Sequence, residues 1–159
     1  MVIGDSMKVV ALDPGGTTGI CFASIDDRVV TLIPVERRLD SRGMHWYVES
    51  LINLHEPDFA IVYEDFQFRQ GVRTGLDLTP AKLIGVIEIF EDTGMLYKQQ
   101  PSIQGKKAFF NDERLKTLNA YWPHGKGHAR SATKHLLYWL KFGAGALYVQ
   151  DPTFVIAEK

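Results

Sequence analysis

Residues 9–20 are the part of this sequence that most constrains the fold. An apolar run ends on the carboxylate of Asp13, a turn of sequence Pro-Gly-Gly-Thr-Thr-Gly follows, and a second apolar run begins at Ile20. Because glycines reverse the chain without strain, this pattern predicts a buried strand, a tight turn and a second strand. A carboxylate beside the backbone N–H groups of such a turn can hold a metal ion or meet a phosphate. The alternative is that these residues only form a hairpin turn.

The order of the apolar segments predicts an α/β fold. Three segments joined by short turns come first and indicate an antiparallel meander. Helices and two further strands alternate after it, and such units require parallel pairing with right-handed crossovers. We therefore expect a five-stranded mixed sheet with helices on both faces. The predicted strands cover residues 8–13, 19–25, 28–35, 59–63 and 95–99.

Three main helices are predicted from apolar positions that recur at helical spacing. Asp40 or Ser41 can cap the first helix, because their side chains accept hydrogen bonds from its unpaired backbone N–H groups. Pro80 occupies the first position of the second helix, where a missing N–H costs nothing. The last helix runs from about His128 to Phe142.

Composition bounds the class of protein. With 159 residues and 45% apolar content, we expect a single domain over residues 1–159, with its core at about 8–143 and a loosely attached tail at 144–159. No apolar run is long enough to span a bilayer, and no secretory signal is visible. Cys21 is the only cysteine. A cytoplasmic protein without disulfides is therefore expected.

The charges are distributed unevenly along the chain. The net charge is −1, but residues 1–97 hold 15 Asp and Glu against 8 Lys and Arg, whereas residues 98–159 hold 4 against 10. This asymmetry indicates an acidic half that can collect metal ions and a basic half that can meet phosphate. An ordinary solvated basic surface is the alternative.

Two strand ends and the start of the last helix carry the candidate catalytic residues. In open α/β sheets, functional groups gather at the carboxyl ends of central strands, and Asp13 and Glu64 end the first and fourth strands. In a sheet of the predicted order these strands are parallel neighbours, so both carboxylates would reach one cation. His128 opens the last helix, where the positive helix end favours a neutral, ligand-competent imidazole. A capping or surface role is the alternative for His128.

Three short motifs together resemble those of a known family. Asp-Pro-Gly-Gly-Thr-Thr-Gly at the first strand, Ile-Val-Tyr-Glu at the fourth and Gly-His-Ala-Arg-Ser-Ala at the last helix are similar to the RuvC family of Holliday junction resolvases. This family is a branch of the ribonuclease H-like superfamily, and small phage-encoded members are the most similar. The resemblance covers about residues 8–143. It implies a ribonuclease H-like fold, catalytic roles for Asp13, Glu64 and His128, and the host cytoplasm as location if the protein is phage-encoded.

The last helix departs from the family pattern. The family has two metal-binding positions three residues apart, Asp or His followed by Asp, and here they hold His128 and Ser131. A hydroxyl is a poorer ligand than a carboxylate, which leaves a second metal ion short of a ligand. Asp65, His135 from one turn later, or a water bridging from Ser131 could compensate. Loss of cleavage with retained junction binding is the remaining interpretation.

The resemblance also implies a mechanism and partners. Two divalent cations, Mg²⁺ or Mn²⁺, roughly 4 Å apart would clamp the scissile phosphodiester, and an imidazole ligand favours Mn²⁺. Paired nicks across a four-way junction need two active sites, so the resemblance implies a homodimer. It also implies a role in DNA recombination and repair, and we expect no membrane association. The expected DNA contacts are an aromatic residue that stacks on bases and several basic residues that meet phosphates. They are Phe68 (with Phe66 as second choice), Arg69, Lys106, Lys107, Lys126 and Arg130.

Two other functions fit parts of the sequence. The turn after Asp13 also resembles the phosphate loop of actin-like sugar kinases, but those folds need two such domains and more than twice this chain. A junction- or RNA-binding protein of the same superfamily without nuclease activity is the second alternative, and the serine at position 131 makes it credible.

Overall fold

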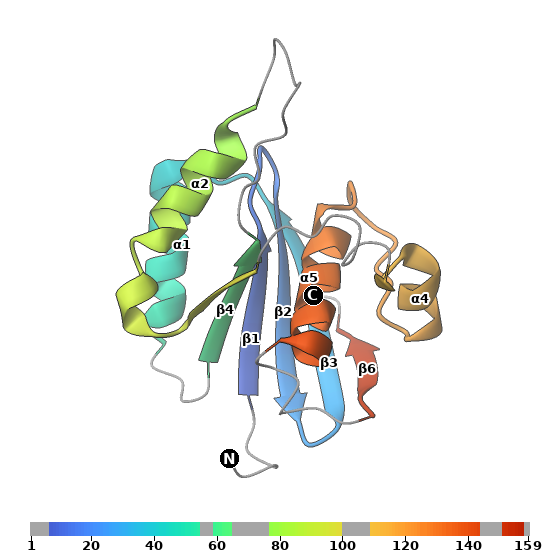
Figure 1. Ribbon diagram of the computed structural model, residues 1–159. Helices are drawn as coiled ribbons and strands as arrows, with labels where there is room; N and C mark the ends of the chain where they lie inside the picture. Colours follow the sequence, from blue (N-terminus) through green and yellow to red (C-terminus); the bar gives the residue numbers. More distant parts are fainter. Residues whose placement is uncertain (1–6, 55–58, 65–76, 100–108, 144–150, 158–159) are drawn as a thin grey trace.

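A mixed six-stranded β-sheet forms the centre of the molecule (Figure 1). The computed structural model describes residues 7–54, 59–64, 77–99, 109–143 and 151–157. The strand order is β5-β4-β1-β2-β3-β6. The first three strands form an antiparallel meander, whereas β4 pairs parallel with β1, β5 with β4 and β6 with β3. The strands are β1 (Met7–Asp13), β2 (Thr18–Asp26), β3 (Val29–Arg37), β4 (Phe59–Glu64), β5 (Leu96–Gln99) and β6 (Thr153–Ile156).

Helices cover both faces of the sheet, as predicted (Figure 1). Two helix starts agree with the sequence signals: the Asp40 carboxylate accepts a hydrogen bond of 2.7 Å from the Gly43 amide, and Pro80 lies in the first turn of its helix. No described helix is long and apolar enough to cross a membrane. The described helices are α1 (Ser41–Ile52), α2 (Thr79–Glu88), the short 3₁₀ helix η1 (Glu91–Thr93), α4 (Asp112–Thr117) and α5 (His128–Phe142).

The central strand β1 separates two apolar cores. Successive side chains of a strand point to opposite faces. Val9 and Ala11 accordingly pack in the core beneath α5, whereas Val10 and Leu12 pack in the core beneath α1 and α2. All four side chains are at most 1% exposed, which explains why the strand is apolar without interruption from Val9 to Leu12, whereas Lys8 near its start is exposed.

The sheet has six strands and not the predicted five, because β6, within the segment predicted to be a loose tail, pairs at one edge of the sheet. Residues 153–156 pair with residues 29–32 of β3. The strand is held by Phe154, whose side chain is 7% exposed and whose carbonyl accepts a hydrogen bond from the Asn119 side chain at 3.2 Å. A four-residue strand has too little periodicity to be recognised from sequence, because its pairing partner lies more than 100 positions earlier.

Candidate metal centre

The positions of Asp13 and Glu64 follow from the alternation of β1 and β4. The two strands are parallel neighbours in which Leu12 pairs with Tyr63, so the next residue of each strand is an acid. Leu12 and Tyr63 both face α1 and α2. Because side chains alternate, the two acids that follow face α5. Strand pairing and alternation together thus place two carboxylates side by side beneath one helix.

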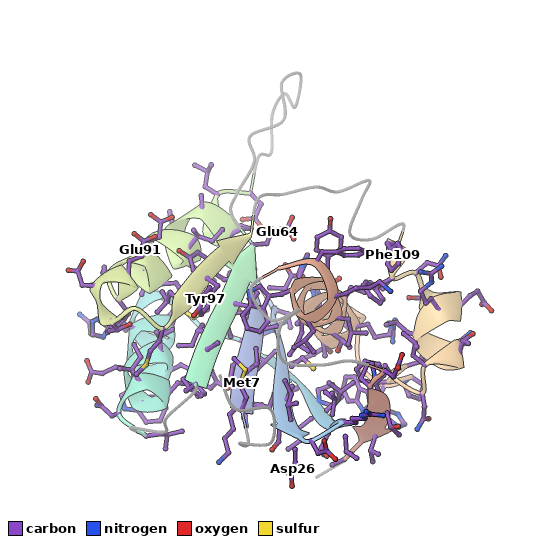
Figure 2. The ribbon with its side chains drawn as sticks, turned by 60° about the horizontal axis from the view of Figure 1, so that its bottom comes forward. Met7, Asp26, Glu64, Glu91, Tyr97 and Phe109 are labelled. Atoms are coloured by element: carbon purple, nitrogen blue, oxygen red, sulfur yellow. The ribbon has the colours of Figure 1, made fainter. Side chains whose placement is uncertain are left out.

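His135 of α5 completes the cluster. Its imidazole is 1% exposed, and its Nε2 lies 2.6 Å from Oε2 of Glu64 and 3.8 Å from Oδ1 of Asp13. One ligand atom from each of the three residues lies within 4.8 Å of the others. Figure 2 shows Glu64 at the end of β4, on the side to which α5 packs. We refer to Asp13, Glu64 and His135 as the metal-site cluster.

The path of α5 across the sheet explains why His135, rather than His128, belongs to this cluster. The helix begins over β2 and β3, where the His128 carbonyl lies directly against Gly19. It then crosses toward β5, where the Trp139 ring packs at 5.3 Å from the Tyr97 ring. Two turns of helix, roughly 10 Å, separate residues 128 and 135. The residue above the ends of β1 and β4 therefore comes in the middle of α5.

Glu36 of β3 caps the start of α5. Its carboxylate accepts hydrogen bonds from the backbone amides of Lys126 at 2.8 Å, His128 at 2.8 Å and Ala129 at 3.3 Å. Burial raises the pKa of Glu36, but these three hydrogen bonds and the nearby His128 outweigh burial and leave the pKa below its usual value. Gly125 makes this possible, since its φ is +73° and a Cβ there would lie within 2.2 Å of the carboxylate. Glu36 thus fixes where α5 begins.

Of the other predicted site residues, the structure describes Ser131, Arg130 and Lys126, and it does not describe six others. Ser131 lies one turn before His135, half-buried on the same side of α5. Arg130 donates a hydrogen bond of 3.1 Å to the Trp122 carbonyl, and its guanidinium lies over the Tyr121 ring at 5.2 Å, so it holds the loop before α5. Lys126 is exposed. Residues Asp65, Phe66, Phe68, Arg69, Lys106 and Lys107 lie outside the described part of the chain.

The sequence does not predict the observed places of two residues of the site. It indicates His135 only as a substitute for Ser131, although a position seven residues after His128 lies on the same helical face. No sequence pattern identifies Glu36. Its contact with the start of α5 spans 90 to 93 positions, and no local pattern records it.

The comparisons with known proteins give structural likenesses alone. No protein-family model and no curated protein matches the sequence. RuvC of Thermus thermophilus in complex with Holliday junction substrate superposes with a TM-score of 0.59 at 16% identity, covering 86% of this chain and 97% of that chain. A second Thermus thermophilus RuvC structure gives 0.59 at 15% identity, with the same coverage. The yeast mitochondrial Holliday junction resolvase Ydc2 gives only 0.47 at 17% identity, covering 86% and 77%.

The chain has an α/β fold of the ribonuclease H-like class, as the sequence motifs implied. Within that class its fold is that of RuvC, with a mixed sheet of six strands and helices on both faces.

Proposed function

We propose that this protein is a divalent-metal-dependent endonuclease that cuts four-way DNA junctions. The metal-site cluster carries the proposal: two carboxylates and one imidazole converge at the carboxyl ends of β1 and β4, beneath α5. The fold is that of RuvC, and one of the similar structures is RuvC with Holliday junction substrate. Likeness of fold does not define a reaction, so the chemistry has to come from the residues of the site.

The donor atoms of the cluster fit one divalent cation. Bonds of about 2.1 Å place two ligands on opposite sides of an ion at most about 4.2 Å apart, so donor atoms that lie within 4.8 Å of one another need to approach by roughly 0.6 Å or less to share one ion. Carboxylate oxygens suit Mg²⁺ and Mn²⁺, and an imidazole nitrogen suits transition metals better than Mg²⁺. We therefore expect Mn²⁺ to support cleavage more strongly than Mg²⁺.

The protein supplies fixed ligands and open space for a DNA backbone. Asp13, Glu64 and His135 would hold the cation, which when bound would polarise a phosphodiester and lower the pKa of a coordinated water. His135 is buried, so its imidazole is held in one orientation by the surrounding core. The turn after Asp13 has open space at Gly16, where a Cβ would have no neighbour within 4 Å and which lines a hollow with Arg38 and Asp40 before α1. A phosphate can approach there without displacing a side chain.

Ser131 bears on the number of metal ions. It occupies the position where the RuvC pattern has a second acid, and it lies one turn from His135. A hydroxyl binds a divalent cation less well than a carboxylate. We infer that the cluster holds one ion firmly and that any second ion depends on Ser131 through water, or on Asp65. The same observation supports the second candidate function, a protein that binds junctions without cutting them.

Paired cleavage adds an expectation about assembly. A four-way junction has two symmetric strands to cut, so two copies of the metal-site cluster must act on it. We propose that the protein acts as a homodimer, and the mass of the protein–DNA complex in solution tests this directly. Lys126, on the loop before α5, is proposed to meet a phosphate of the bound junction.

The test is a cleavage assay on a labelled four-way junction and on a linear duplex of the same sequence, in Mg²⁺ and in Mn²⁺. Paired nicks restricted to the junction support the proposal. Asp13→Asn should abolish the nicks and leave junction binding intact, because the change removes a metal ligand but no contact with DNA. Asp26→Asn is the matched control, since this exposed acid lies at the opposite end of the sheet.

Two outcomes contradict the nuclease assignment. Tight junction binding without nicks in either metal identifies a binding protein instead. Nicks that survive in Asp13→Asn would show that another site, or a contaminating nuclease, performs the reaction.

A further inference from the structure

Three aromatic rings and two cations form a continuous cluster over α4 and the second half of α5. The Phe109 ring packs edge-on against Phe142 at 5.1 Å between centroids, and Phe142 packs against Tyr138 at 4.8 Å. The Arg114 guanidinium lies 4.1 Å from the centre of the Phe109 ring, and the Lys141 ammonium lies 5.4 Å from it. We call Phe109, Arg114, Tyr138, Lys141 and Phe142 the aromatic–basic cluster.

This cluster begins one helical turn from the metal-site cluster. Tyr138 follows His135 by three residues, and residues at that spacing are neighbours on a helix surface. Phe142 lies one turn further along the same side of α5. In Figure 2, Glu64 and Phe109 are labelled on either side of α5. A strand that is held at the metal-site cluster and runs along α5 toward its C-terminal end would therefore reach Tyr138 and then Phe142.

The charges of this region favour a nucleic-acid strand over an apolar partner. Residues 109–143 contain six Lys and Arg against two Asp and Glu. Both acids already face other lysines: Asp112 lies 2.8 Å from Lys134, and Glu113 lies 3.6 Å from Lys116. Arg114 and Lys141 remain as the cations that flank the rings.

The exposure of Phe142 points to stacking. Its side chain is 51% exposed although it lies among other rings, and Arg114, which lies over the neighbouring Phe109 ring, is exposed as well. An aromatic face flanked by cations is typical of sites that bind single-stranded nucleic acid, because unpaired bases stack on the ring and phosphates meet the charges. Paired bases within a duplex do not offer their faces to a protein surface.

We propose that the aromatic–basic cluster binds unpaired nucleotides of the DNA strand that leaves the metal-site cluster. A base stacks on Phe142, and Arg114 and Lys141 contact the phosphates on either side of it. The path of the strand rests on the proposed function. This surface is built from Phe109 and from residues of α4 and α5, all of which the structure describes, and it does not include the segment after β4 in which the sequence motifs suggested a stacking aromatic.

The experiment measures binding by fluorescence anisotropy in EDTA, with a four-way junction, a single strand and a linear duplex of the same sequence. Phe142→Ala should bind the junction and the single strand about tenfold more weakly than the wild type and should bind the duplex with unchanged affinity. Phe142→Trp, which keeps an aromatic ring, should bind all three DNAs like the wild type. The double variant Arg114→Gln/Lys141→Gln should reduce the salt dependence of junction binding by about two in the log–log slope. Arg28→Gln, at the far end of the sheet, is the control and should leave that slope within about one unit of the wild type.

The outcomes separate this proposal from the proposed function. If the wild type nicks junctions but Phe142→Ala binds every DNA like the wild type, the cluster proposal is wrong and the nuclease proposal stands. An equal loss on duplex and single strand also overturns stacking. If the wild type nicks nothing but Phe142→Ala loses binding to unpaired DNA, the nuclease proposal fails and the cluster proposal stands. A wild type that binds none of the three DNAs overturns both.

Discussion

Gly19→Ala tests whether the close contact between β2 and α5 determines the geometry of the metal-site cluster. A Cβ at Gly19 would lie 1.9 Å from the His128 carbonyl oxygen and 2.3 Å from its carbonyl carbon. Both are backbone atoms, so rotating a side chain cannot relieve the overlap. To reach even 3.0 Å, the start of α5 has to move by about 1 Å relative to the sheet.

The displacement has two measurable consequences. Overpacking of this kind costs about 1–3 kcal/mol of unfolding free energy, which for a domain of this size lowers the Tm by about 3–10 °C. Because α5 carries His135, whose Nε2 lies 2.6 Å from Glu64, the same movement disturbs the metal-site cluster. We expect the affinity for Mn²⁺ to fall by about tenfold or more, as happens when the support of a metal ligand is lost.

Thermal denaturation followed by circular dichroism and Mn²⁺ titration followed by electron paramagnetic resonance measure both effects. Gly16→Ala is the matched control. Gly16 lies in the turn just before β2 and a Cβ there has no neighbour within 4 Å, so the Tm of this variant should stay within about 2 °C of the wild type. A Gly19→Ala protein with wild-type Tm and wild-type Mn²⁺ affinity would refute the reasoning, because the helix would then have absorbed the Cβ without moving its ligand.

Three further predictions concern single residues. Ser131→Asp should raise Mg²⁺-supported junction cleavage, since a carboxylate replaces a weak ligand; an unchanged rate would show that another residue already fills this role. Glu36→Gln should lower the unfolding free energy at pH 7 by about 1 kcal/mol in urea titrations. The pKa of Glu36 in the folded protein is below its usual value, so the stabilisation by Glu36 is present above the unfolded pKa of about 4.3 and disappears as the pH falls through the folded pKa. A stability difference between the wild type and Glu36→Gln that persisted in stronger acid would contradict this prediction. Burial raises the pKa of the Cys21 thiol to about 12 and outweighs the hydrogen bond with Thr133, which lowers it. A thiol reagent at about pH 8 should therefore label Cys21 only in the unfolded chain, and labelling of the native protein would contradict this prediction.

Local signals in the sequence predict most of the elements, because each depends on a few neighbouring residues. Asp40 and Pro80 mark helix starts by the hydrogen bonds that they make or cannot make. The apolar runs before Asp13 and Glu64 identify central strands, and strand order then implies that the two acids are neighbours.

What the sequence did not predict depends on how distant elements meet. The choice between His128 and His135 is decided by the diagonal path of α5 over the sheet, which Gly19 and Glu36 fix through contacts with residues far along the chain. Helical spacing shows that the two histidines share a face, but it does not show which of them stands above β1 and β4. The roles of these residues in catalysis stay predictions until the variants are measured.

The outer edge of β3 restricts how this protein can associate with other chains. An open strand edge is a template for pairing with another copy, and sheets grow or aggregate there. Here β6 occupies the edge along residues 29–32, and Pro34, which has no N–H to donate, interrupts the remainder beside Trp122 and His124. Sheet extension from β3 is therefore blocked in both halves of the strand. The homodimer proposed above cannot form by sheet extension from β3, and loss of residues 153–156 would expose the backbone N–H and C=O groups along residues 29–32 to pairing with another chain.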